Sequence, residues 1–498
     1  MWIKLIMPGA RMRPMDSLWK THMSPPLPLL VVGALTPAEH RVTLENENVE
    51  KLHLDDAPDL VGISVTCDTF DRAAEIADVY RARGTLVVMG GIHPTACPEM
   101  CEKSADAVVI GPAEPVWGQI LADIIAGTLK HRYHASSAQD LSSTPVPRWG
   151  LINEGDYLFT NTMCIGRGCP WKCDFCYNSA ENVDAGYQRK PLANILAEIE
   201  ALGTRHVMFT DDNFIGSPDR TRELLRTMHG MDLTWHCAVS TDIGRHEDIL
   251  DQMAETGCKS LFIGFETIRL DGLTSCHKYQ NRVEEYDQTI RKIHERGMMV
   301  NASMVFGFDT DTPDVFVSTF EWLKRNRIET LTSHILTPYP GTKLHARLQV
   351  EGRIVDRNLR NYDTAHVVFE PAGMTAEDLY SGYLGMYRKF YSWRSIFDRM
   401  PQDHSQAIAY LQFSLFYRKF GKLTSRAGHL IGMRRLARFA KWLAYGGARV
   451  QQNVNITVKW TGWSPARVSS DAHRDDAARQ HTCARGHLCE SDILGHRS

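Results

Sequence analysis

The sequence predicts an α/β protein with an N-terminal doubly wound parallel sheet, a partial (β/α)6 barrel and a C-terminal helical region. Short apolar runs alternate with helical patterns over residues 1–135, and six further strand–helix units recur over residues 157–345. A Ser/Pro-rich connector, residues 136–156, separates these two blocks. The chain has 498 residues, of which 43% are hydrophobic, so it is long enough for two or three domains with sizeable cores.

The first block predicts a sheet with a ligand-binding edge. Its strand-like and helical segments are Trp2–Met7, Leu27–Leu35, Arg41–Leu44, Leu60–Val65, Ala73–Arg83, Thr85–Met89, Ala107–Ile110 and Val116–Ala126. Small or polar residues follow several strands: Ser64, Thr66, Gly90, Gly91, Gly111 and Glu114. Ligands of doubly wound sheets lie beyond the carboxyl ends of the strands, where small residues let a large group approach the backbone. Plain turn chemistry is the alternative, because Gly commonly ends strands.

The second block predicts the barrel. Its strand candidates are Leu158–Met163, His206–Thr210, Leu233–Val239, Ser260–Phe265, Val300–Phe306 and Thr330–Thr337. Helical patterns lie between them at Leu192–Leu202, Thr221–Met228, His246–Thr256, Val283–Arg296 and Asp314–Asn326. In barrels of this kind the chemistry gathers at the carboxyl ends of the strands.

Polar residues stand at those strand ends. Asp211, Asp212 and Asn213 follow the second strand, Ser240 follows the third, and Glu266 follows the fourth. Carboxylate and amide acceptors there suit the ammonium group of a ligand. An Asx-type turn explains the first three without any ligand. A Glu at a buried strand end needs a partner in either case.

Residues 169–176, CPWKCDFC, are the most informative segment of the chain. They place three thiols at C-x3-C-x2-C spacing on a loop after a strand-like run. Three thiolates leave one iron of a [4Fe–4S] cube open to a small molecule, which indicates catalysis rather than structure. A zinc knuckle is the alternative, but tetrahedral zinc needs a fourth Cys or His, and the nearest other thiol is Cys164.

Together these features resemble the radical S-adenosylmethionine (SAM) enzymes with an N-terminal cobalamin-binding domain, the class B radical SAM methyltransferase-like superfamily. The resemblance rests on the thiol spacing, on the aromatic residue before the third Cys, and on the Gly-Gly-x-His-Pro and Gly-x-x-Glu order of the first block. It implies a Rossmann-like cobalamin-binding fold for residues 1–135 and a radical SAM core for residues 157–345. It also implies a [4Fe–4S] cluster held by Cys169, Cys173 and Cys176.

The resemblance assigns the remaining candidate residues to two cofactors. SAM would lie near Phe175, Asp211, Asp212, Asn213, Ser240 and Glu266. Cobalamin would lie along Ser64, Thr66, Gly90, Gly91, Gly111 and Glu114. One departure concerns the cobalt-ligating D-x-H-x-x-G motif of many cobalamin proteins, which is absent from the loop of residues 8–14. We therefore expect cobalt without a protein His on its lower face, and His93 to shape its loop rather than bind cobalt.

The implied reaction is methyl transfer to an unactivated carbon or phosphorus centre of a small-molecule or lipid-like metabolite. An electron donor such as flavodoxin or ferredoxin is the implied partner. Two alternatives stay open: a radical SAM oxidoreductase, cyclase or rearranging enzyme without methyl transfer, and a non-enzymatic cluster or zinc protein. Fold alone does not choose among them.

The C-terminal region predicts helices followed by a polar tail. Helical patterns cover Tyr380–Tyr391, Ala407–Phe420 and His429–Tyr445 within residues 346–450. The last of them is basic and aromatic, and we expect it to pack on the barrel rather than lie on a membrane surface. Residues 451–498 lack periodicity and predict disorder; their His481-x-Cys483 and His487-x-Cys489 pairs are a weak metal signal.

Composition limits the partners and the cellular location that the sequence predicts. The net charge of −3 gives no indication of a nucleic-acid partner. Twelve Cys without a disulfide-scaffold pattern predict a reducing, cytoplasmic location. Residues 1–10 are too short an apolar run for a secretory signal, and no apolar run is long enough to predict a transmembrane helix.

Overall fold

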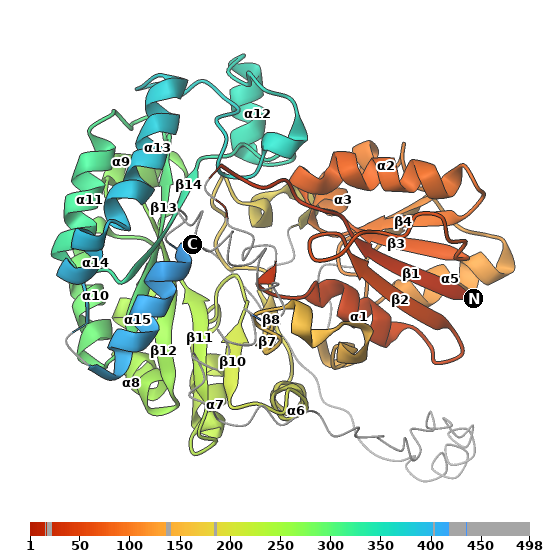
Figure 1. Cartoon of the computed structure of the whole chain (residues 1–498), viewed down its shortest axis with the longest axis horizontal. Coiled ribbons are helices and arrows are strands. Elements are labelled where there is room, and N and C mark those ends of the chain that lie inside the picture. Colours follow the sequence, from red (N-terminus) through yellow and green to blue (C-terminus); the bar gives the residue numbers. More distant parts are fainter. Residues whose placement is uncertain are drawn as a thin grey trace, which may run out of the picture. The chain divides into compact units, whose positions relative to one another are not determined.

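The protein is described by a computed structural model that covers residues 1–14, 16, 22–135, 141–183, 187–401, 404–417 and 435. All of these residues fall within one compact unit, residues 1–448. The unit contains two six-stranded sheets, and a two-stranded ribbon accompanies the second (Figure 1).

The first sheet is wholly parallel. Its strands are β1 (Trp2–Met7), β2 (Arg41–Asn46), β3 (Leu60–Ser64), β4 (Leu86–Gly90), β5 (Ala107–Ile110) and β6 (Arg132–His134), in the order β2-β1-β3-β4-β5-β6. The chain leaves β1 toward one edge for β2 and returns on the other side for β3. This change of direction creates a crevice at the carboxyl ends of the strands.

Helices cover both faces of this sheet because both faces are apolar. α1 (Leu27–Leu35) and α5 (Trp117–Ala126) lie on one face, and α2 (Phe70–Arg81) lies on the other (Figure 1). The alternation within a strand sends neighbouring residues into different cores: Leu60 packs with Trp117, whereas Val61 packs with Ile76. The short helices α3 (Ile92–Ala96) and α4 (Pro98–Cys101) follow β4. The predicted doubly wound sheet is confirmed.

The second sheet is the predicted partial barrel. Its strands are β7 (Thr162–Met163), β10 (His206–Phe209), β11 (Thr234–Val239), β12 (Cys258–Glu266), β13 (Met299–Phe306) and β14 (Thr330–Ile335), all parallel, in the order β14-β13-β12-β11-β10-β7. The connecting helices are α6 (Leu192–Ala201), α7 (Pro218–Met228), α8 (Glu247–Glu255), α9 (Leu270–Ser275), α10 (Tyr286–Glu295) and α11 (Val315–Arg325). β7 and β14 do not pair with each other, so the barrel is open.

The first barrel strand is shorter than the sequence predicts. Only its last two residues pair in the sheet. The amides of Leu158 and Phe159 instead donate to the carbonyls of His22 and Met23, at 2.7 and 2.8 Å. The start of the predicted strand is therefore bonded to a segment from the first block.

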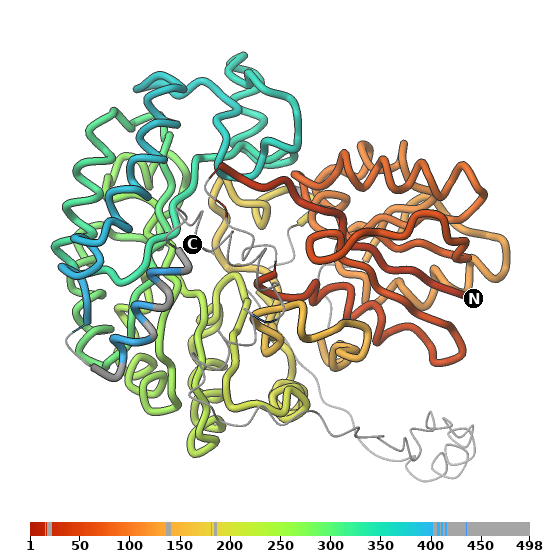
Figure 2. The backbone as a smooth tube through the Cα atoms, viewed as in Figure 1, coloured from red at the N-terminus to blue at the C-terminus, as the bar shows by residue number. Residues whose placement is uncertain are grey.

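The connector between the sheets holds short 3-10 turns, at Leu141–Ser143, Trp149–Leu151 and Glu154–Asp156 (Figure 2). Past the barrel lie α12 (Lys343–Val350), α13 (Ala376–Phe390), α14 (Trp393–Asp398) and α15 (His404–Tyr417). Thr375 caps α13 with Asp378 in a capping box. The predicted tail of residues 451–498 lies outside the described residues, as does the predicted helix 429–445 apart from residue 435.

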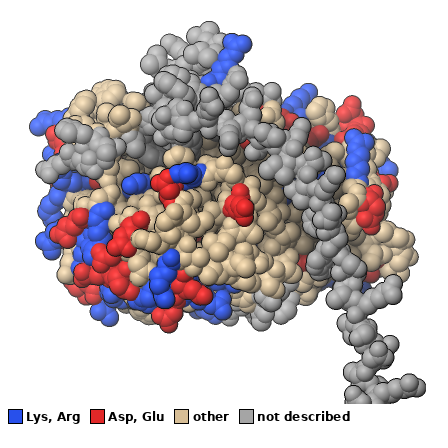
Figure 3. All heavy atoms as spheres, turned by 90° about the horizontal axis from the view of Figure 1, so that it is seen from below, with Lys and Arg blue, Asp and Glu red and all other residues tan. Residues whose placement is uncertain are grey.

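Two surface properties complete the description. Acidic and basic side chains are interspersed on the face shown in Figure 3, in keeping with the small net charge. Among the described residues, no helix has the length and apolar character needed to cross a membrane.

Candidate functional site

The thiol loop is bracketed by a short ribbon. β8 (Gly166–Arg167) leads into the loop and pairs antiparallel with β9 (Gln188–Arg189), which follows it. Cys173 is buried, while Cys169 and Cys176 are partly exposed. The amide of Cys176 donates to the carbonyl of Cys173 at 2.9 Å, which folds the last turn of the loop.

Two opposing effects act on the ionisation of the three thiols. Burial raises the pKa of Cys169 to about 11 and that of Cys176 to about 12, and it also raises the pKa of Cys173. The ammonium of Lys278 acts in the opposite direction on all three. Gln280 also donates from Nε2 to Sγ of Cys173 at 3.6 Å. A cation and an amide donor therefore stand ready to stabilise thiolates.

The loop does not present a closed metal site. Within the described part of the chain, no three His, Cys, Asp or Glu side chains lie close enough to hold a metal ion. The fit to an iron–sulfur cluster rests on the donor chemistry: three free thiols on one loop, beside a buried cation.

Glu266 ends β12 in a strained conformation and is paired. Its φ is 64°, in the left-handed region that disfavours side chains, and the strand pairing shifts register there. Oε1 lies 2.5 Å from Nζ of Lys278, and both residues are buried. Burial lowers the pKa of Lys278, but the charges of Glu266 and Cys173 outweigh it and raise the pKa overall. Glu266 was expected from the sequence; Lys278 was missed, because nothing in the sequence marks it.

The carboxylates after β10 have different surroundings. Both oxygens of Asp211 accept from the Ile165 amide at 3.1 Å, and Oδ1 accepts from the Gly166 amide at 2.6 Å. Burial raises the pKa of Asp211 to about 7 despite these donors. Asp212 accepts one bond, from Nδ2 of Asn178 at 2.9 Å, and its charge influences the pKa of Cys169 and Cys176. Asp211 thus holds the ribbon, and Asp212 lies nearer the thiols.

Three other expected SAM residues lie around the barrel. Asn213 is buried and donates from Nδ2 to Oγ of Ser240 at 3.1 Å, and Ser240 in turn donates to Asp242. Phe175 packs edge-on to Phe308, with ring centroids 6.3 Å apart, and the ammonium of Lys278 lies 5.9 Å from its ring. These contacts place Phe175 beside the Glu266–Lys278 pair.

A largely apolar cavity of about 560 Å³ joins the two halves of the molecule. It is bordered by the carboxyl edge of the first sheet, by α1 and by α5. On the barrel side it reaches both flanks of the thiol loop. The expected residues that line it are Ser64, Gly90, Gly91, Gly111, Glu114, Asp211 and Asp212. The cavity therefore brings the small-residue edge and the two flanks of the thiol loop to one space, although none of the three thiols lines it.

Two residues of the first block that the sequence analysis discussed, Thr66 and His93, do not line this cavity. Thr66 caps the 3-10 turn Cys67–Thr69, and its hydroxyl donates to Asp68 at 2.7 Å. His93 is fully buried against Phe70, with ring centroids 5.1 Å apart, and neither ring nitrogen has a hydrogen-bond partner among the residues that the structure describes. Burial lowers the pKa of His93 to about 4, so the ring is neutral.

The glycines of the cavity wall differ in how much space they leave. Gly91 has φ +113°, and a Cβ there would lie 2.8 Å from the carbonyl oxygen of Val65. Gly90 has an ordinary conformation, and its Cβ would meet only Val109, at 3.7 Å. Gly62, in the middle of β3, also lines the cavity, between Leu5 and Trp117. The sequence analysis missed Gly62, although an isolated Gly within a strand indicates close approach of another group.

An ion pair joins the two halves at the cavity wall. Arg167, in β8, donates from Nη1 and Nη2 to the carboxylate oxygens of Glu114 at 3.0 and 2.5 Å. The Glu114 carboxylate is nearly buried, whereas Arg167 is partly exposed. Because β8 leads directly into the thiol loop, Glu114 fixes that loop against the first sheet.

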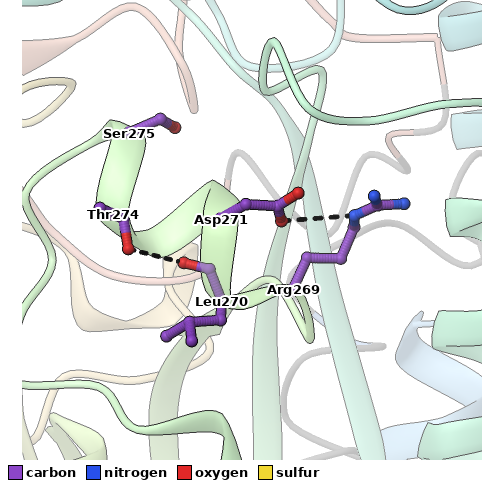
Figure 4. A pocket seen from close by; sticks show the side chains of 5 residues that line it. All are labelled: Arg269, Leu270, Asp271, Thr274 and Ser275. Atoms are coloured by element: carbon purple, nitrogen blue, oxygen red, sulfur yellow. Dashed lines mark hydrogen bonds and ion pairs between the residues drawn. The ribbon is translucent and has the colours of Figure 1, made fainter.

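A second, open hollow lies on α9. It is lined by Arg269, Leu270, Asp271, Thr274 and Ser275 (Figure 4). The Arg269 guanidinium lies 3.5 Å from Asp271, and the Thr274 hydroxyl donates to the Leu270 carbonyl at 2.9 Å. These two contacts engage part of the polar groups drawn there.

Known families match successive parts of the chain. The Radical SAM superfamily matches residues 163–323, the B12 binding domain matches residues 24–120, and a domain of unknown function (DUF4070) matches residues 342–440.

Similar proteins match across these parts together. Bacteriochlorophyllide d C-12(1)-methyltransferase of Chlorobaculum tepidum is 27% identical over 81% of this chain and 90% of its own length. Hopanoid C-2 methylase of Rhodopseudomonas palustris is 27% identical over 66% of this chain and 65% of its own. The cobalamin-dependent S-adenosylmethionine radical enzyme OxsB, solved with aqua-cobalamin and S-adenosylmethionine, matches with a TM-score of 0.61. That match has 13% identity and covers 89% of this chain and 72% of OxsB, so it supports the fold.

Proposed function

We propose that this chain, which belongs to the radical SAM enzymes with an N-terminal B12-binding domain, methylates an unactivated carbon of an apolar metabolite. The observation that carries the proposal is the cavity bordered both by the small-residue edge of the first sheet and by the flanks of the thiol loop. Methyl transfer by SAM and cobalamin requires that both cofactors reach the same substrate. A shared space between their expected sites meets that requirement.

Cys169, Cys173 and Cys176 would hold the cluster, and we expect the loop to close around it on binding. Lys278 would offset the carboxylate of SAM, and Glu266 would accept from its amino group or ribose hydroxyls. Asp212, with a single hydrogen-bond donor among the described residues, is better placed to accept the SAM ammonium than Asp211, which is held by two backbone amides. Phe175 would pack near the adenine.

Cobalamin would lie along the carboxyl edge of the first sheet. Gly90, Gly91 and Gly111 leave room for the corrin at that edge. Behind it, Gly62 opens an apolar slot between the sheet and helices α1 and α5, which suits a flat group of the cofactor. No His of the described residues lines the cavity, so we expect no protein nitrogen on cobalt.

The two cofactors supply a radical that abstracts hydrogen from the substrate and a methyl group that replaces that hydrogen. Overall, each methylation consumes two SAM and two electrons and yields S-adenosylhomocysteine, methionine and 5′-deoxyadenosine. The chain's own residues bind and orient these groups, and the apolar cavity wall excludes water.

The substrate class comes from the relatives. One is named for bacteriochlorophyllide and another for hopanoid, and both are polycyclic molecules with extensive apolar surface. We propose a substrate of this kind.

The test is anaerobic reconstitution with iron, sulfide and cobalamin, followed by incubation with methyl-deuterated SAM, a reductant and apolar extracts from a strain lacking this enzyme. We expect deuterated methyl groups in an extractable product, together with 5′-deoxyadenosine and S-adenosylhomocysteine. The variant with Ala at Cys169, Cys173 and Cys176 should lose cluster absorption and both products, whereas Cys164→Ala should keep the cluster.

The outcomes separate the competing functions. 5′-Deoxyadenosine without methyl transfer, with cobalamin bound, would support a radical cyclase or oxidoreductase instead. Zinc in place of iron and sulfide would contradict the radical SAM chemistry altogether.

A further inference from the structure

We propose that the surface formed by Lys172, Arg269, Leu270, His277, Tyr279 and Lys343, called the α9 surface, is the docking site of a small acidic one-electron carrier protein. The proposal rests on the proposed function, because each turnover there consumes electrons that the chain does not supply. In the docked complex the carrier is oxidised by one electron and the cluster is reduced, and that electron is spent in cleaving SAM to methionine and the 5′-deoxyadenosyl radical.

The first argument is position. Asp174, next to Cys173, donates its amide to the carbonyl of Cys276 and accepts from the amide of Leu344, both at 3.1 Å. Its carboxylate also lies 2.7 Å from Nδ1 of His277. The turn after α9 and the start of α12 therefore cover the thiol loop directly. The flanks of the same loop face the cavity shared with the first sheet, which leaves this surface as an approach from solvent.

The second argument is exposed apolar area. Leu270 is 63% exposed and Tyr279 is 66% exposed, among the most exposed large apolar side chains of the described residues. Leu270 borders the open hollow on α9 shown in Figure 4. Tyr279 lies edge-on to His277, with ring centroids 5.5 Å apart, which holds its ring in place. Exposed aromatic and aliphatic side chains around a hollow are typical of protein contact sites.

The third argument is charge. The acids on this surface have partners: the Asp174 carboxylate lies 2.7 Å from the His277 ring, which carries charge only when protonated, and Asp271 lies 3.5 Å from the Arg269 guanidinium. Lys343, at the start of α12, and Lys172, within the thiol loop, both expose their side chains. The Lys343 ammonium pairs with no carboxylate of the described residues. An excess of positive charge at a rim favours an acidic partner and speeds its association.

The test compares a double variant, Leu270→Glu with Lys343→Glu, against a matched control, Val317→Glu with Lys130→Glu. The control makes the same chemical changes on other elements, at a valine that is 58% exposed and at an exposed lysine. SAM cleavage is measured against the concentration of reduced flavodoxin, a small acidic flavoprotein, and separately with dithionite. All positions changed are exposed, and folding is checked by cluster absorption.

We expect the flavodoxin concentration at half-maximal cleavage to rise about tenfold in the double variant and to stay unchanged in the control. The difference should shrink as salt is raised, because rim charges are screened. Dithionite-driven cleavage should be equal in all three proteins. Equal flavodoxin dependence of the double variant and the control would overturn the docking proposal. Absence of dithionite-driven cleavage in the wild type would instead overturn the proposed function.

Discussion

At the scale of single residues, the Glu266–Lys278 pair is the most consequential contact of the candidate site. Both side chains are buried, and the strained backbone of Glu266 holds its carboxylate at the lysine. A buried ion pair contributes little net stability, but removing one partner leaves an uncompensated charge. A pair of this kind, kept in a strained backbone beside thiols, is a candidate for ligand binding.

Glu266→Gln should therefore lower the free energy of unfolding by about 3–5 kcal/mol, because Lys278 keeps its charge without a partner. The double variant with Lys278→Met should be more stable than Glu266→Gln alone, since it removes both charges. Denaturant unfolding of the three proteins measures this. A double variant less stable than the single variant would show that the pair is not coupled.

Asp211 should make stability depend on pH. Burial raises its pKa to about 7, so the folded chain keeps a proton that the unfolded chain has released. Stability should fall as pH rises from about 4 to about 7 and level off above that. The Asp211→Asn variant keeps an oxygen that can accept from the Ile165 and Gly166 amides, but it has no titrating carboxyl group. The dependence of its stability on pH should therefore be flatter than in the wild type. Unfolding midpoints of both proteins between pH 5.5 and 8 test the sign.

A site residue could be predicted from the sequence only where it belongs to a recognisable motif. The thiols and the small residues of the first sheet stand in recognisable patterns of spacing, and the expected glycines line the cavity. Lys278 stands twelve positions after Glu266, and their contact depends on the path of α9. Thr66 matched the pattern of small strand-end residues, yet a local helix cap uses its hydroxyl.

At the scale of elements, α13 covers the free edge of β14 through the hydroxyls of two tyrosines. The Tyr387 hydroxyl accepts from the Ser333 amide at 2.9 Å and donates to the Ser333 carbonyl at 3.0 Å. The Tyr391 hydroxyl does the same at Leu331, at 2.9 and 2.8 Å. Two tyrosines one helical turn apart thus satisfy the backbone of β14 that would otherwise pair with a further strand.

Removing either hydroxyl should leave two buried backbone groups unsatisfied. We expect Tyr387→Phe and Tyr391→Phe each to lower the free energy of unfolding by about 1–3 kcal/mol. Tyr380→Phe, on the same helix but only partly buried, serves as the control and should change stability little. Hydrogen exchange of the Ser333 and Leu331 amides should quicken in the matching variant. Unchanged exchange at both amides would contradict the role of the two tyrosine hydroxyls at the β14 edge.

Most elements were predictable because their apolar runs have clear periods and turn signals. The ribbon β8–β9 was not, since its strands are two residues long and are held by the Asp211 carboxylate at Ile165 and Gly166. The predicted start of the first barrel strand, at Leu158, was wrong for a similar reason. Its amides bond to residues 22 and 23, far away in the sequence.

At the scale of the whole molecule, the two cofactor sites should be separable by substitution. The sequence suggests both Gly90 and Gly91 as positions at which a side chain would block cobalamin. The structure favours Gly90, because a Cβ at Gly91 would collide with the backbone of Val65. A side chain at Gly90 meets only ordinary contact, and Gly90 itself lines the cavity.

Gly90→Leu should reduce bound cobalamin at least tenfold while cluster absorption and SAM cleavage persist. Gly118→Leu, on the exposed side of α5 with open space around it, is the matched control and should keep full cobalamin content. The visible spectrum of the purified proteins measures both cofactors at once. Full occupancy in Gly90→Leu would place the corrin elsewhere.

The ion pair between Glu114 and Arg167 has a thermodynamic consequence for how the enzyme is loaded. It connects the wall of the cavity at the first sheet to the strand that enters the thiol loop, so a ligand that shifts one partner shifts the other. Linkage then requires reciprocity: whatever factor bound cobalamin gives to SAM affinity, bound SAM must give to cobalamin affinity. Titrating each cofactor with and without the other should return the same factor, and in Arg167→Ala that factor should fall toward one. The enzyme would thereby favour the doubly loaded state over either half-loaded one.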